Sequence, residues 1–69
     1  MLVINRIGPR ARALEAWRNA EEVASERWDA FLEAAPETRR WAFASYFAAL
    51  DAEEAAANEL ASFSFDVAA

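Results

Sequence analysis

The sequence contains no cysteine and no histidine. Disulfide bonds, thiolate zinc sites and imidazole ligands are therefore excluded, and only carboxylates remain as side chains that can ligate a metal. Without histidine, the serine and threonine hydroxyls have no imidazole base to activate them, which excludes a conventional nucleophilic triad. We therefore expect no enzyme activity, no cofactor and no metal site.

Glycine, proline and lysine are also scarce: the 69 residues include one glycine, two prolines and no lysine. A single glycine cannot form a glycine-rich loop that binds phosphate. The seven basic residues are all arginines, and with twelve acidic residues the net charge is −5. Because this charge repels phosphate backbones and anionic membrane surfaces, nucleic acid and membranes are disfavoured partners.

No apolar run is long enough to cross a bilayer. The most apolar stretch, Trp41–Leu50, is far shorter than the about 20 residues that a transmembrane helix needs. Near the N-terminus, Leu2–Ile4 is followed at once by Asn5 and Arg6, a pattern that lacks the basic region and apolar core of an export signal. We expect a cytoplasmic protein, and the use of arginine without lysine beside abundant alanine hints at a bacterial, GC-rich source.

Apolar spacing predicts a first helix over residues 9–34. Gly8 followed by Pro9 is typical of a helix start, because glycine is an acceptable N-cap and proline suits the first helical position. From there, apolar residues recur every three or four positions, which is the period of an amphipathic helix. The residues of this stripe are Leu14, Trp17, Ala20, Ala24, Trp28, Phe31 and Ala35.

A second helix is predicted over residues 36–62, because Pro36 disfavours helical geometry in the residue before it and starts helices well. Glu37 is expected in its first turn, where a negative charge favours the helix dipole. Two helices joined by a minimal turn predict an antiparallel αα-hairpin. Asp51 and Glu54 also match a capping box, so a break near Leu50 that gives three helices stays open.

The two ends of the chain are predicted to be extended or to form short strands. Residues 1–7 are rich in β-branched residues, and Phe63, Phe65 and Val67 alternate with polar residues at strand period. Leu60, Phe63 and Val67 also fit helical spacing. An isolated two-stranded ribbon is marginal in water, so docking of extended ends onto the helices is the favoured arrangement.

The aromatic residues of the second helix predict self-association. A chain this short buries only about 60% of the surface of its unfolded form, and with disulfides and imidazole sites excluded, oligomerisation is the remaining way to stabilise it. Trp41, Phe43, Tyr46 and Phe47 spread around much of the helix, so one partner helix cannot cover them all. We expect a symmetric homodimer that forms a four-helix bundle, or binding to another protein. The predicted interface comprises Trp17, Trp28, Phe31, Trp41, Phe43, Tyr46, Phe47 and Leu50.

A short segment offers an alternative function. Ala35–Trp41, which reads Ala-Pro-Glu-Thr-Arg-Arg-Trp, resembles the opening of recognition helices in small helix-turn-helix regulators. The resemblance covers seven residues and implies DNA binding. The segment departs from that pattern because it lacks a glycine-containing turn and follows a long helix instead of a short one. The sequence therefore favours a protein–protein interaction or accessory module, with a DNA-binding regulator as the alternative.

Overall fold

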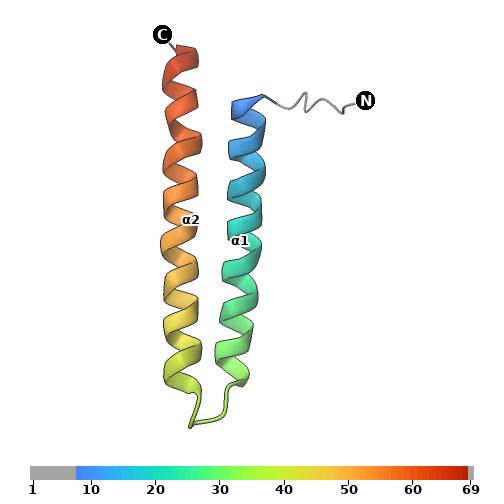
Figure 1. Ribbon diagram of the computed structural model, residues 1–69, viewed down its shortest axis with the longest axis vertical. Coiled ribbons are helices and arrows are strands. Elements are labelled where there is room, and N and C mark those ends of the chain that lie inside the picture. The colour runs from blue at the N-terminus through green and yellow to red at the C-terminus, as the bar shows by residue number, and fades with distance from the viewer. Residues whose placement is uncertain (1–7, 69) are drawn as a thin grey trace, which may run out of the picture.

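The protein is a hairpin of two antiparallel α-helices (Figure 1). The computed structural model describes the backbone of residues 8–68 and the side chains of residues 8–63. Helix α1 spans Pro9–Glu33 and helix α2 spans Arg39–Ala68. The Cα atoms extend only 12 Å along the shortest axis, so the two helices form a single layer. The prediction of an all-α hairpin is confirmed.

The start of α1 is set by Gly8 and Pro9. Gly8 has an extended backbone, with φ −73° and ψ 173°, and its carbonyl accepts the first helical hydrogen bond from the Arg12 N–H at 3.0 Å. Pro9 occupies the first helical position, where its missing N–H costs nothing and its φ suits the helix. The last residue of α1 is Glu33, after which Ala34 is again extended.

The connection between the helices is a tight turn with Pro36 at its second position. The Thr38 N–H donates to the Ala35 carbonyl at 3.0 Å, and the Thr38 hydroxyl donates to the same oxygen at 3.3 Å. Proline favours this turn position because its φ is already set. The Thr38 carbonyl then accepts the Ala42 N–H at 3.0 Å, so Thr38 is the N-cap of α2. Consequently α2 begins at Arg39, three residues later than the expected start at Pro36, and Glu37 lies in the turn.

Helix α2 continues without a break from Arg39 to Ala68. The three-helix alternative with a break at Asp51 is therefore not adopted. The prediction of an extended C-terminal end is wrong for residues 63–68, which are helical. Leu60, Phe63 and Val67 keep the helical spacing of the preceding residues, and no glycine or proline follows Pro36 to end the helix. The prediction for residues 1–7 lies outside the described residues.

The contact between the two helices is a seam whose most buried residues are alanines. The buried residues are Ala13, Ala24 and Ala49, and no large side chain of the described residues is fully buried. Besides Leu50 and Ala57, the buried or half-buried residues of α2 recur at alternating steps of three and four, which is the spacing of a helix–helix seam. These residues are Ala42, Tyr46, Ala49, Glu53, Ala56, Leu60 and Phe63. Of the predicted interface residues of α2, Tyr46 belongs to this seam, whereas Phe43, Phe47 and Leu50 lie to one side of it.

Candidate interaction surface

Five aromatic side chains lie in mutual contact across the turn half of the hairpin. Trp28 contacts Phe31 on its own helix, with ring centroids 5.4 Å apart, and Tyr46 on α2, with ring centroids 5.0 Å apart. Phe31 contacts Phe43 on α2 at 5.5 Å. Phe43 in turn contacts Tyr46 at 6.5 Å and Phe47 at 6.1 Å. The tilted ring geometries of four of these pairs are those that aromatic quadrupoles favour.

This cluster is open to solvent on one side. Phe43 is 47% exposed, Phe47 is 55% exposed and Trp28 is 40% exposed. Leu32, four residues after Trp28 and therefore on the same side of α1, is 60% exposed. We define the aromatic face as Trp28, Phe31, Leu32, Phe43, Tyr46 and Phe47. This exposure is unusual, because a folded chain normally buries large apolar residues in its core.

The exposed apolar area of the aromatic face is as large as that of apolar surface patches that bind other molecules. Large aromatic side chains present about 150–250 Å² each, so the exposed parts of Trp28, Leu32, Phe43 and Phe47 sum to about 400 Å². Contiguous apolar patches of about 300–600 Å² on a monomer are often functional. A standard protein–protein interface buries about 800 Å² per partner, so the patch corresponds to about half of one side of such an interface.

The structure brings together five of the eight predicted interface residues. Trp17 and Leu50 are half-buried, and neither contacts the five aromatic rings in the ring pairs described above. Trp41 lies two positions before Phe43, which is about 200° around the helix, so it faces away from the aromatic face. It is 77% exposed. Leu32 was missed by the sequence analysis, although its spacing of four from Trp28 is a usable signal.

The opposite side of the hairpin carries two adjoining shallow pockets. The first, of about 370 Å³, lies at the open end of the hairpin. Its lining residues are Pro9, Arg12, Ala13, Ala16, Ala56, Glu59 and Phe63. The second, of about 310 Å³, lies towards the middle and is lined by Ala16, Asn19, Ala20, Val23, Ala49 and Ala52. Ala16 lines both pockets, so they adjoin each other, and we call the two together the alanine groove.

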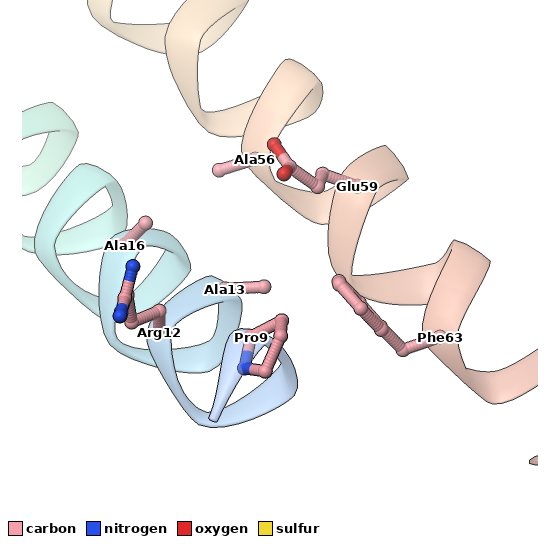
Figure 2. Close-up of a pocket in the computed structure, with 7 residues that line it drawn as sticks. All are labelled: Pro9, Arg12, Ala13, Ala16, Ala56, Glu59 and Phe63. Carbon is pink, nitrogen blue, oxygen red and sulfur yellow. The ribbon is translucent and has the colours of Figure 1, made fainter. Parts of the chain in front are cut away.

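Figure 2 shows how the two helices form the first pocket. Pro9 and Ala13 of α1 point toward α2, and Phe63 of α2 points toward them across the gap between the helices. Arg12 and Glu59, one from each helix, provide the charged groups at this pocket. The floor is apolar and the rim carries one charge of each sign.

The charged side chains of the described residues do not gather into a chemical site. Within residues 8–63, no group of three or more acidic side chains is placed to hold a metal ion. The arginines that the DNA-binding alternative needs are split between the two ends of the hairpin. Arg10 and Arg12 lie in the first turn of α1 at the open end, whereas Arg39 and Arg40 lie at the start of α2 beside the turn.

The comparisons with known proteins give the chain no relatives. No protein-family model matches it, and no curated protein or solved structure resembles it at a significant level. Among the described residues, no helix has a stretch long and apolar enough to cross a membrane. The fold places the protein in the class of α-helical hairpins. The features that bear on its function are those of its surface.

Proposed function

We propose that this protein is a small, non-enzymatic interaction module of the cytoplasm that acts as a homodimer through its aromatic face. The observation that carries the proposal is the exposure of Phe43 and Phe47, which are about half exposed although they lie in a cluster of contacting rings. A second copy placed on this face would remove these rings from water. At about 25 cal/mol per Å² of apolar area, covering this face contributes several kcal/mol per chain.

The geometry of the hairpin supports a four-helix bundle as the form of this dimer. Single layers of secondary structure bury their apolar faces against a second layer. A symmetric dimer uses the same patch on both copies, so the two aromatic faces meet each other. The alanine seam within each hairpin lets α1 and α2 approach closely, which leaves the large side chains to fill the space between the two layers. The four helices then share one aromatic core.

The test is the mass of the protein in solution, measured by light scattering on a sizing column over a range of concentrations. We expect a mass near twice the chain mass of 7.7 kDa. Phe47→Asp places a charge on the aromatic face, where the dimer would bury it unpaired, and we expect this variant to be monomeric. A wild-type mass of one chain at every concentration would overturn the homodimer.

Ala48→Asp is the matched control. Ala48 is the neighbour of Phe47 and is exposed, but it lies about 100° around the helix from it, away from the aromatic face. The same charge is introduced one position away, so its effect on net charge and solubility is equal in the two variants. Alanine is the better helix former, so Ala48→Asp costs more helix propensity than Phe47→Asp and is a stringent control. We expect Ala48→Asp to keep the wild-type mass. If both variants were monomeric, the loss would be a general effect and the aromatic face would not be the interface.

A further inference from the structure

The side of the hairpin that carries the aromatic face continues toward the open end. Residues seven positions apart keep the same place relative to a helix–helix seam, so residues of the aromatic face have counterparts farther from the turn. Leu14 is fourteen positions before Trp28, and Leu50 is seven positions after Phe43. Leu14, Leu50 and Trp17, which lies one turn after Leu14, are half-buried. The middle of this side is therefore apolar in the open half as well.

Two charged residues lie at the outer edges of the same side in the open half. Arg18 is fourteen positions before Leu32, and Glu54 is seven positions after Phe47. Each therefore continues, on its own helix, the line that the exposed apolar residue begins. Arg18 and Glu54 are both exposed. They flank the apolar strip, one on α1 and one on α2.

Arg18 and Glu54 also lie at nearly the same level of the hairpin. The contact between Trp28 and Tyr46 fixes the register of the two helices. Ten residues from this contact toward the open end are Arg18 on α1 and Ala56 on α2. Glu54 is two positions from Ala56, which is about 3 Å along the helix. A second copy that meets this side at the same level would therefore bring the two charges together.

We propose that the two hairpins of the dimer pack with their turns at the same end, so that Arg18 of each copy lies against Glu54 of the partner subunit. This inference rests on the homodimer proposed above. A twofold axis parallel to the helices places α1 of one copy on α2 of the other at the same level. The rings then meet rings in the turn half, and the half-buried apolar residues meet in the open half. The symmetry repeats the ion pair, which gives two pairs in the dimer.

The area that a stable dimer needs favours this arrangement. The aromatic face supplies about half of one side of a standard interface of about 800 Å² per partner, so the rest comes from the open half. If the turns lay at opposite ends and the aromatic faces met, only the turn halves would overlap. If such copies were shifted to full overlap, the rings would lie on the half that carries Arg18 and Glu54. Same-end packing covers the whole length and also keeps the rings together.

The charges favour the same arrangement. Arg18 is the only basic residue between Arg12 and Arg27, and Glu21 lies one turn after it on the same side of α1. In the same-end dimer, Arg18 lies between the carboxylates of Glu21 and the partner's Glu54, so it offsets their repulsion. With the turns at opposite ends, α1 lies on the α1 of the other copy, and Arg18 does not reach Glu54 of the partner subunit.

The orientation is tested by distances between spin labels, since the chain has no cysteine and a single introduced cysteine takes one label. Ala11→Cys labels the open end and Glu37→Cys labels the turn, both at exposed positions. Neighbouring helix axes lie about 8–10 Å apart, so same-end packing gives separations below about 30 Å at both sites. With the turns at opposite ends, the two separations along the helices add to about 75 Å, so at least one exceeds about 35 Å.

Pulsed electron–electron double resonance measures both separations. Light scattering and circular dichroism verify that the labelled variants keep the mass and helix content of the wild type. We expect two short separations. A separation above about 35 Å at either site in a dimeric sample would overturn same-end packing.

A charge exchange tests the ion pair itself. In a homodimer of Arg18→Glu, or of Glu54→Arg, like charges face each other at both pairs, whereas in the heterodimer of the two variants opposite charges face each other at both. We expect each variant alone to dimerise at least about tenfold more weakly than the wild type. An equimolar mixture should form mainly the heterodimer, which native mass spectrometry distinguishes from the two homodimers.

The matched control is the mixture of Arg27→Glu with Glu59→Arg, which changes the net charge of each chain by the same amount. Glu59 lines the alanine groove, and Arg27 lies one turn after Val23, which also lines it. Both residues are exposed, and both lie away from the aromatic face. We expect random proportions of heterodimer and homodimers. The same preference for the heterodimer in both mixtures would be an effect of net charge and would overturn the ion pair.

The failure of this inference can be told apart from the failure of the homodimer. A wild-type mass of one chain at every concentration overturns both proposals. A mass of two chains with one long label separation leaves the homodimer standing and overturns only the same-end packing.

Discussion

The ring of Trp28 on α1 lies 5.0 Å from the ring of Tyr46 on α2, with the ring planes tilted by 49°. This contact joins the two helices in the turn half of the hairpin. Tyr46 is half-buried, whereas Trp28 remains 40% exposed, so the pair lies where the seam meets the aromatic face. It therefore connects the packing of the single chain with the surface that we propose for dimerisation.

We expect Trp28 and Tyr46 to be energetically coupled. Trp28→Ala and Tyr46→Ala each remove the contact between the two rings. The double variant should therefore lose less free energy of unfolding than the two single variants lose in sum, by about 0.5–1.5 kcal/mol. Urea unfolding followed by circular dichroism measures the three variants against the wild type at one protein concentration, because dimerisation makes stability depend on concentration. Strict additivity of the two losses would show that the rings do not stabilise the hairpin together.

The sequence predicted the hairpin well because its signals are local. Gly8–Pro9 and the single interruption at Pro36 define where helices can start, and the three-to-four spacing between them is typical of amphipathic helices. The start of α2 was misplaced by three residues because Pro36 is compatible with both a helix start and a turn. The turn is adopted because the Thr38 N–H and hydroxyl both donate to the Ala35 carbonyl.

The seam could not be predicted from the sequence to the same extent. Alanine is common on every side of both helices, so Ala13 and Ala49 carry no signal that separates buried from exposed alanines. The apolar stripe predicted for the first helix contains Trp17, Trp28 and Phe31, and the aromatic residues of the second helix were predicted to form an interface with another chain. In the structure, alanines are the most buried residues of the contact, and the rings of Phe43 and Phe47 lie at its edge. Trp41 and Phe43 differ by only two positions, and only the direction of the seam reveals that they face opposite sides.

We expect the alanine seam to tolerate no larger residue. Ala24 is 5% exposed, and it lies at the level of Ala49, because the contacting pair Trp28 and Tyr46 fixes the register of the two helices. Ala24→Leu should force the helices apart and reduce the free energy of unfolding by about 1–3 kcal/mol. Ala55→Leu, at an exposed position of α2, is the control and should change it by less than about 0.5 kcal/mol. Equal effects in thermal unfolding would contradict a closely packed seam.

The start of α2 offers a stabilising substitution. Thr38 is the N-cap, its hydroxyl donates to Ala35, and the first turn of α2 contains no acidic residue. Thr38→Asp places a carboxylate at the positive end of the helix dipole and should raise the free energy of unfolding by about 0.5–1 kcal/mol at low salt. The gain should shrink as salt is added, because the interaction is exposed. Thr38→Asn is the uncharged control, and a salt-independent gain would mean that the dipole is not the cause.

The seam contains one acidic residue, Glu53. It is half-buried, and it lies between Ala49 and Ala56 in the run of seam positions along α2. A carboxylate at such a position gives up part of its hydration when the hairpin forms, whereas an apolar side chain gains from the same burial. Glu53→Leu should therefore raise the free energy of unfolding by about 1 kcal/mol. The measurement is urea unfolding followed by circular dichroism.

The control for this substitution is Glu54→Leu, one position further along α2. Glu54 is exposed, so the same change of residue there alters net charge and helix propensity equally but adds little buried area. We expect it to change stability by less than about 0.5 kcal/mol. Equal gains from the two variants would indicate relief of the overall negative charge, since the chain carries a net charge of −5. A gain confined to Glu53→Leu would show that position 53 belongs to the seam, and that the chain keeps a charge there at a cost in stability.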